Sequence, residues 1–275
     1  LPIDFTGLGH VNCYLLEDRD GVAIVDPGLP GLSSYKVLRR RLASAGFPIK
    51  RVHTVIVTHS HPDHFGGAGR VQHESGAQVV THQRFRLMWD PSEPPDVDVE
   101  DLPEVAKLLG RRFPWDPTPW DGKQMAFSWK RKLALRASRH LPRLMRTPTP
   151  TMRLNEAETI SLAGRDWVAI HTPGHTEDHL CLFDPTDGVM LSGDHVLPTI
   201  TPHVGGLSPM ADPLATFLES LDKIAAYGDD VSVVLPAHGH PFSSLAARAE
   251  SIKQHHVDRL DQLRGEMQGC GRCGN

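Results

Sequence analysis

One short stretch decides the fold of this chain: Val55-Ile56-Val57-Thr58-His59-Ser60-His61-Pro62-Asp63-His64. Its apolar start is typical of a buried strand, and Pro62 keeps the following residues from continuing at once into a helix. The HxHxDH pattern places four metal-binding side chains within six positions, a much tighter grouping than isolated members of the chain's 17 histidines would give. In a loop even the neighbours Asp63 and His64 can point at one site, so the stretch predicts a metal centre.

Three further candidate ligands come singly and late in the chain. They are His175 in Thr-Pro-Gly-His-Thr, Asp194 in Ser-Gly-Asp, and His238 in Pro-Ala-His-Gly, each placed after an apolar, strand-like segment. Imidazole and carboxylate together suit Zn²⁺ or another borderline divalent ion. Two such ions side by side make a hydroxide nucleophile at neutral pH, so the ligand set predicts hydrolytic chemistry.

The composition is that of an ordinary globular protein. Of 275 residues, 39% are apolar and 23% are charged, and the net charge of -4 with a pI near 6.5 gives no reason to expect nucleic acid as a partner. No apolar run approaches the ~20 residues that span a bilayer. No secretory leader is recognised, so we expect a cytoplasmic protein that acts on a small molecule.

Strands and helices alternate along the chain. Strands are expected at Cys13–Glu17, Val22–Asp26, Val55–Val57, Gln78–Thr81, Trp167–His171, Leu180–Phe183, Val189–Leu191 and Val231–Leu235. Helices are expected at Tyr35–Ala45, Ala68–Glu74, Pro213–Tyr227 and Ser243–Leu263. Two halves of similar organisation, each with ligands in loops at strand ends, predict an α/β protein in which sheets lie between helices.

An insertion of about 84–152 separates the two halves. It carries four of the five tryptophans: Trp89, Trp115, Trp120 and Trp129. Three interpretations fit them: a cap or wall of the substrate pocket, attachment of the insertion to the main body, or a homodimer interface. The basic residues of an expected helix at 128–146 fit a clamp for anionic groups, a membrane-surface helix, or a solvated face.

We expect one metallo-hydrolase domain over residues 1–264 and a C-terminal tail over 265–275. The tail contains a CxxC pair, Cys270 and Cys273, and no second pair exists to complete a four-cysteine zinc site. Cys13 and Cys181 lie in strand-like segments and are expected to be small core residues.

These motifs, in this order, resemble those of the metallo-beta-lactamase fold superfamily, from Gly9–Leu16 to His238. The resemblance implies a four-layer αβ/βα sandwich. It also implies that Asp26, in Val-Asp-Pro-Gly, supports the metal loop. The implied ligands are His59, His61 and His175 for the first metal, and Asp63, His64 and His238 for the second, with Asp194 bridging both.

Asp63 and Asp194 are the candidate catalytic residues. They would orient a metal-bridging hydroxide, and Asp63 would also accept the proton of the nucleophile. Two divalent ions per chain are expected, Zn²⁺ first, with iron or manganese as alternatives.

The residues around Asp194 favour a glyoxalase II or lactonase-like branch over true beta-lactamases, which lack a bridging carboxylate there. Asp194 is followed by His-Val-Leu-Pro-Thr, not by the Gly-Cys-Gly-Arg usual in glyoxalase II and persulfide dioxygenases, and Leu197 stands about where lactonases often place a Tyr. We expect hydrolysis of an ester, thioester or lactone with an apolar and, in one interpretation, an anionic portion. The alternatives are a mononuclear iron oxygenase of the persulfide dioxygenase kind, and promiscuous beta-lactamase or phosphodiesterase activity.

Overall fold

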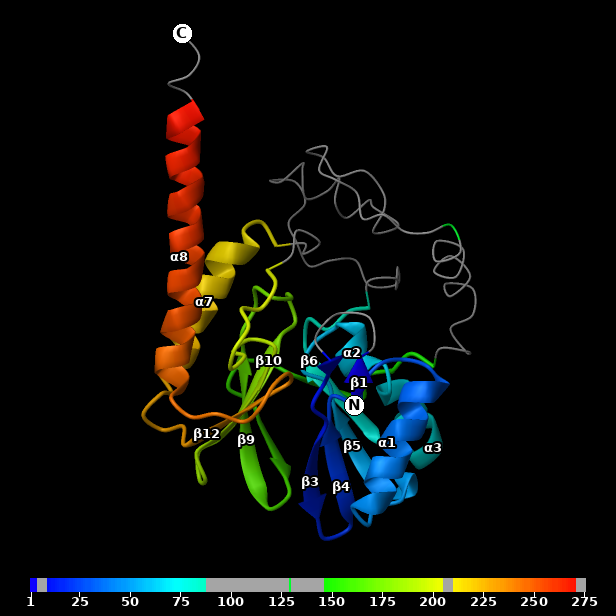
Figure 1. The fold of residues 1–275 in the computed structure, drawn as a ribbon. Coiled ribbons are helices and arrows are strands. Elements are labelled where there is room, and N and C mark those ends of the chain that lie inside the picture. Colours follow the sequence, from blue (N-terminus) through cyan, green and yellow to red (C-terminus); the bar gives the residue numbers. More distant parts are fainter. Residues whose placement is uncertain (4–8, 88–128, 130–145, 205–209, 271–275) are drawn as a thin grey trace.

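Two five-stranded sheets lie face to face between helices (Figure 1). The computed structural model describes residues 1–3, 9–87, 129, 146–204 and 210–270, with 268–270 as backbone only. A separate two-stranded ribbon, β1 (Pro2–Ile3) and β2 (Gly9–His10), lies near the N-terminus. Within the described residues, no helix is both long and apolar enough to cross a membrane.

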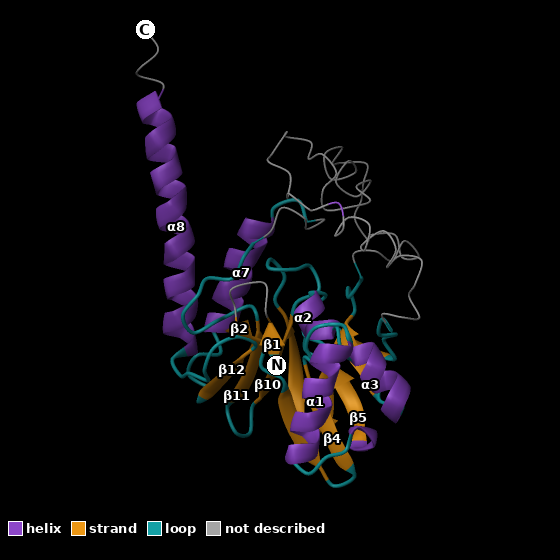
Figure 2. Ribbon diagram, turned by 45° about the vertical axis from the view of Figure 1, so that its right-hand side comes forward, coloured by secondary structure: helices purple, strands orange, loops and turns teal. Residues whose placement is uncertain are grey.

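The first sheet has the order β3-β4-β5-β6-β7. Its strands are β3 (Tyr14–Asp18), β4 (Gly21–Val25), β5 (Val52–Ile56), β6 (Gln78–His82) and β7 (Met152–Leu154). β3 is antiparallel to β4, and the remaining neighbours are parallel. The outer face is covered by α1 (Leu32–Ser44), η1 (Ile49–Arg51) and α3 (Ala68–Ser75), visible beside the strands in Figure 2.

The second sheet has the order β12-β11-β10-β9-β8. Its strands are β8 (Thr159–Leu162), β9 (Arg165–His171), β10 (Leu180–Asp184), β11 (Val189–Gly193) and β12 (Val233–Pro236). Neighbouring strands from β8 to β11 are antiparallel, and β12 is parallel to β11. α7 (Pro213–Ala225) and α8 (Leu245–Cys270) cover this sheet on the side away from the first one (Figure 1).

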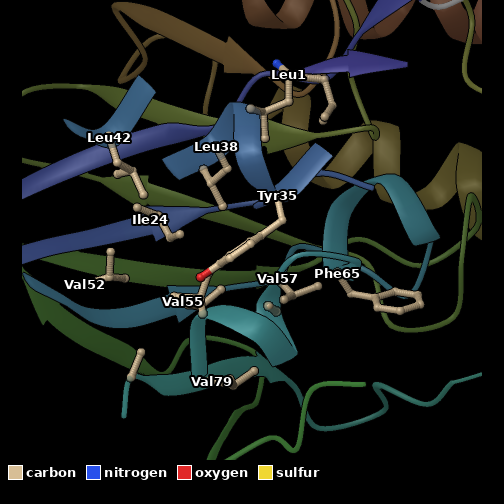
Figure 3. Close-up of a cluster of buried hydrophobic side chains, with 14 of the residues drawn as sticks. Leu1, Ile24, Tyr35, Leu38, Leu42, Val52, Val55, Val57, Phe65 and Val79 are labelled. Carbon is tan, nitrogen blue, oxygen red and sulfur yellow. The ribbon is translucent and has the colours of Figure 1, made fainter. Parts of the chain in front are cut away.

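Three apolar clusters separate four layers. The first joins α1 and α3 to the first sheet, and Leu38 and Leu42 of α1 belong to the same buried cluster as Val55 of β5 (Figure 3). A second lies between the sheets, and a third joins α7 and α8 to the second sheet. Ile56 faces the second cluster while its neighbours Val55 and Val57 face the first, which explains why this strand is apolar on both faces. The predicted four-layer α/β sandwich is confirmed.

Two predictions about local structure are wrong. The residues after His61 form a short helix, α2 (Pro62–Phe65), and not a loop, because Pro62 occupies its first position, where a missing N–H costs no hydrogen bond. The last helix continues beyond its predicted end at Leu263 and reaches Cys270. No proline follows to stop it, and Gly265 within a helix costs only about 1 kcal/mol relative to alanine.

Most of the insertion lies outside the described residues, and with it the predictions for Trp89, Trp115, Trp120 and the basic helix. Its first residues do belong to the body, because Phe85 and Leu87 are buried in the first cluster. Of its tryptophans the structure describes Trp129, whose side chain is 70% exposed. The pair Cys270 and Cys273 also falls outside the described side chains, whereas Cys181 is buried in the third cluster as expected and Cys13 packs against the first.

Candidate metal centre

Loops at the ends of strands from both sheets meet at one edge of the sandwich. His59 and His61 follow β5, whereas Asp194 follows β11 and His238 follows β12. β4 and β5 are parallel, as are β11 and β12, so in each sheet the carboxyl ends of the paired strands share an edge. The Leu180 N–H donates to the Thr58 carbonyl at 2.9 Å and ties the two edges together.

The first group of candidate ligands consists of His59, His61, His175 and Asp194, whose ligand atoms all lie within 4.8 Å of one another. His61 Nδ1 is 3.0 Å from His59 Nε2 and 3.0 Å from His175 Nε2. Asp194 Oδ2 completes the group at 3.5 Å from His175 Nε2 and 3.9 Å from His59 Nε2.

The second group consists of Asp63, His64 and His238, again within 4.8 Å of one another. Asp63 Oδ2 is 3.5 Å from Nε2 of both histidines. Asp194 also reaches this group, with Oδ1 3.3 Å from His238 Nε2 and Oδ2 3.5 Å from His64 Nε2. The structure therefore brings all seven predicted residues together and places Asp194 between the two groups.

Backbone carbonyls fix the orientation of two of these histidines. His175 Nδ1 donates to the His203 carbonyl at 2.6 Å, and His238 Nδ1 donates to the His10 carbonyl at 2.6 Å. Because a carbonyl can only accept, Nδ1 carries the proton. In the neutral ring, Nε2 then turns a lone pair toward the centre.

Asp26 fixes the orientation of two more histidines, His59 and His64. Its carboxylate accepts from Thr58 N at 2.9 Å, Thr58 Oγ1 at 2.8 Å and His64 Nδ1 at 2.8 Å, and these bonds hold its backbone at φ 53°, an unusual value for a residue other than glycine. Since the Thr58 hydroxyl proton is used, its oxygen accepts from His59 Nδ1 at 3.0 Å. His59 and His64 thus also point an Nε2 lone pair inward, and the predicted support from Asp26 is confirmed.

The donor set fits divalent cations. Among the described residues, His64 Nε2, His238 Nε2 and Asp194 Oδ1 are buried without a hydrogen-bond partner. An unsatisfied buried polar atom costs about 1–3 kcal/mol, and a cation would satisfy all three. Imidazole nitrogens with carboxylate oxygens are ligands that zinc and similar ions prefer. His59, His61, His175 and Asp194 would hold one ion, and Asp63, His64 and His238, with Asp194, would hold another.

The charges of the two groups differ. Burial and the neighbouring histidines hold the pKa of His59 well below its usual range and lower the pKa of His61 to about 3. Burial also acts to lower the pKa of His238, but the carboxylates of Asp194 and Asp63 outweigh it and raise the pKa to about 10. A proton and a metal ion would therefore compete for His238 Nε2, and metal binding there would release a proton.

Several supporting groups carry no signal that could have found them in the sequence. The carbonyls of His10 and His203 could come from any residue type. His179 lies behind Asp194 and accepts its backbone N–H at 3.0 Å through Nε2. Its position four residues after His175 suggests proximity, but the hydrogen bond to Asp194 depends on how the β9–β10 and β11 ends meet in space.

Comparison with known proteins agrees with this arrangement. A protein-family model described as the metallo-beta-lactamase superfamily matches residues 6–238. The chain is 24% identical to the probable metallo-hydrolase YqjP of Bacillus subtilis over 270 residues, covering 96% of this chain and 77% of YqjP. It is 28% identical to the uncharacterised protein YobT of the same organism over 193 residues, or 69% of this chain and 64% of YobT.

Solved structures give the same result. A metallo-beta-lactamase family protein from Thermus thermophilus superposes with a TM-score of 0.74 and 28% identity, covering 96% of this chain and 79% of the other. A beta-lactamase domain protein from Burkholderia ambifaria superposes with a TM-score of 0.68 and 26% identity, covering 97% of this chain and 72% of the other. With the family model spanning most of its length, this chain belongs to the metallo-beta-lactamase superfamily.

Proposed function

We propose that this chain is a binuclear, zinc-type hydrolase that attacks the carbonyl of an ester, thioester or lactone. The observation that carries the proposal is the position of Asp194 between two complete groups of ligands. Two divalent ions bound there would supply a hydroxide nucleophile at neutral pH and polarise the attacked carbonyl. The name of YqjP, a probable metallo-hydrolase, supports the reaction class.

The two carboxylates take different roles. Asp194 has a side chain only 8% exposed and lies among four histidines, so it holds the geometry. Asp63 is 16% exposed, twice as much, and can exchange protons with solvent more readily. We assign to Asp63 the acceptance of the proton released as the nucleophile attacks.

The substrate is proposed to be a small molecule with an apolar portion beside its carbonyl group. This part of the proposal rests on the sequence, in which four of five tryptophans fall in the segment 84–152 between the two halves that supply the ligands. Tryptophan offers a large apolar face, which suits an acyl chain or an apolar ring on the substrate.

The test combines metal analysis with a substrate screen. Purified protein is analysed for metal content and then assayed against thioesters, lactones, simple esters, beta-lactams and phosphodiesters. We expect two divalent ions per chain and hydrolysis of a carbonyl substrate that stops on chelation and returns with Zn²⁺. A single iron per chain with oxygen consumption on a persulfide substrate would contradict the proposal, as would phosphodiester hydrolysis without carbonyl hydrolysis.

A further inference from the structure

The segment that carries His238 is clamped by residues from the opposite end of the chain. The Asn12 backbone N–H donates to the Ala237 carbonyl at 2.7 Å. The Tyr14 hydroxyl lies 2.7 Å from the Pro236 carbonyl, and His238 Nδ1 lies 2.6 Å from the His10 carbonyl. Residues 10–14 therefore hold the turn 236–239 along its whole length.

Asn12 makes the central contact of this clamp. Its Nδ2 donates to the Pro236 carbonyl at 2.9 Å and to the Gly239 carbonyl at 2.8 Å, one on each side of His238. The orientation of the amide is fixed by its partners, since two carbonyl oxygens require a donor. Both amide protons are thus directed at the backbone on either side of His238, which determines where the His238 side chain lies.

The backbone at this turn needs such support. Gly239 has φ +86°, and a Cβ there would lie 2.7 Å from Pro198 Cγ, so the chain turns sharply directly after His238. On its other side the turn is tied to the second sheet by the Ala237 N–H, which donates to the Gly193 carbonyl at 2.9 Å. A change in the Asn12 side chain would leave the hydrogen bond from Ala237 to Gly193 in place. It would therefore alter the orientation of the turn while the turn stays attached to the second sheet.

The clamp acts on one group of ligands and not on the other. In the part of the chain that the structure describes, the side-chain hydrogen bonds of Asn12 reach Pro236, Gly239 and Tyr14. His59 and His175 are oriented by other partners, Thr58 and the His203 carbonyl. The first group should therefore keep its geometry when the clamp is weakened.

We propose that Asn12 is a positioning residue for His238 and thereby sets the affinity of the second group, Asp63, His64 and His238, for its divalent ion. The inference rests on the proposed function in one respect, that both groups bind metal. Groups that orient a ligand from behind typically contribute 10–100-fold in metal affinity. We call the step that fills the first group the first step and the step that fills the second group the second step. Asn12 would contribute this amount to the second step and nothing measurable to the first.

The decisive variant is Asn12→Asp, which keeps the shape of the side chain and replaces two donors by acceptors facing two carbonyl oxygens. Its matched control is Gln72→Glu, the same amide-to-acid change at a residue whose amide bonds the Thr149 backbone away from the centre. Metal-free protein is titrated with Zn²⁺ by calorimetry, and the stoichiometry is checked by elemental analysis. Absorption spectra of Co²⁺-loaded protein report the geometry of each site separately.

For wild type and Gln72→Glu we expect two binding steps of unchanged affinity. For Asn12→Asp we expect an unchanged first step, a second step weakened about 10–100-fold, and loss of the second Co²⁺ absorption component. Tyr14→Phe removes one hydrogen bond to Pro236 and should weaken the second step several-fold, which decides the matter if Asn12→Asp does not fold.

Failure of the positioning role and failure of the proposed function can be told apart. Two tight steps in Asn12→Asp, or in Tyr14→Phe where the former is unfolded, overturn the positioning role and leave the binuclear site intact. Equal weakening of both steps in a folded variant overturns it as well. Wild type that binds a single ion overturns the proposed function, and the second-step role of Asn12 with it.

Discussion

Asp194 is the side chain on which the two groups of ligands converge. Its two oxygens lie between 3.3 and 3.9 Å from Nε2 of four histidines: His59, His64, His175 and His238. Burial alone would raise the pKa of this carboxyl, but His64 and the other histidines around it hold the pKa well below its usual range. The group is therefore an anion ready to share its charge between two cations.

Replacing Asp194 by Asn should abolish hydrolysis while leaving the fold intact, because the shape is kept and the negative charge is lost. We expect kcat/KM to fall by at least about 10³-fold, the scale seen when a central catalytic group is removed. Steady-state kinetics and circular dichroism are the measurements, with Asp187→Asn at an exposed ion pair with Arg165 as the control. Turnover equal to wild type would refute the role assigned to Asp194.

Asp26→Asn tests the support behind the ligands. Asparagine tolerates the left-handed backbone of Asp26, so the strain is unchanged. Its amide cannot accept from Thr58 and His64 together as the carboxylate does, and the tautomer of His64 is no longer imposed. We expect metal affinity to fall 10–100-fold, measured by competition with a chromophoric chelator. An affinity equal to wild type would show that Asp26 matters for folding alone.

Asp178 predicts a pH dependence of stability. Burial raises the pKa of this carboxyl to about 6, despite a hydrogen bond from Ser60 Oγ to Oδ1 at 3.0 Å. Because the folded pKa is higher than the unfolded value of 3.8, stability from the protonated form is present below 3.8 and lost as pH rises through 6. As pH rises from 3.8 to 6, the free energy of unfolding of Asp178→Asn should increase relative to that of wild type by up to about 3 kcal/mol. Above pH 6 the difference between the two proteins should stay constant. A difference in unfolding free energy, measured with urea at matched metal loading, that does not change with pH would contradict this.

The spacing of polar side chains predicted which residues gather at the candidate metal centre, because a metal site requires those residue types. All seven residues found from HxHxDH and the three later motifs lie in the two groups. The carbonyls of His10 and His203, and the amide of Asn12, were not predicted. A carbonyl has no residue signature, and the role of Asn12 exists only because residues more than 220 positions apart are brought together.

Strands end in tight turns where the candidate ligands begin, and Gly193, directly before Asp194, is one example. It has φ +50°, and a Cβ would lie 2.6 Å from His179 Nε2, so alanine would both strain the backbone and displace His179 or Asp194. Gly193→Ala should lower the free energy of unfolding by about 2–4 kcal/mol and weaken metal binding.

Gly164→Ala is the matched control for that change. Gly164 also has a left-handed backbone, at φ +67°, but a Cβ there would meet nothing within 4 Å. The Gly164→Ala change should lower the free energy of unfolding by only about 1–2 kcal/mol and leave metal affinity unchanged. Equal losses of metal affinity in the two variants, measured by zinc titration, would show that the close approach at Gly193 is irrelevant.

Apolar runs predicted most strands and helices, since buried elements must be apolar on the faces they bury. The run Val55–Val57 predicted the existence of β5, although the strand begins earlier, at Val52, and ends at Ile56. α7 begins at Pro213 as predicted, where its N-cap Asp212 accepts from the Ala215 N–H at 2.9 Å. The short helix α2 was missed because four residues are too few to show a helical period. β7 was missed because three residues pair with β6 only through contacts distant in sequence.

The metal ions would join the two halves of the molecule. His59, His61, Asp63 and His64 come from the first half, and His175, Asp194 and His238 come from the second. Ligands that bind the folded state alone stabilise it by RT ln(1 + [L]/Kd), about 4 kcal/mol per ion at 1,000-fold excess over Kd.

Chelation should therefore lower the melting temperature, and the loss should depend on the concentration of free Zn²⁺. Differential scanning calorimetry with buffered Zn²⁺, and with EDTA, is the measurement. Chelation should lower the melting temperature of the Asp194→Asn variant less than that of wild type. An identical melting temperature in Zn²⁺ and EDTA would contradict the view that cations hold the halves together.

The clamp between residues 10–14 and 236–239 has a consequence for biosynthesis. Residues 10–14 leave the ribosome more than 220 residues before the His238 turn, so these partners cannot meet until that turn has also emerged. Contacts of such long range form late and slowly. A nascent chain in which His238 has not yet emerged thus holds at most an incomplete centre, and any chemistry that needs both groups of ligands would have to wait for that turn.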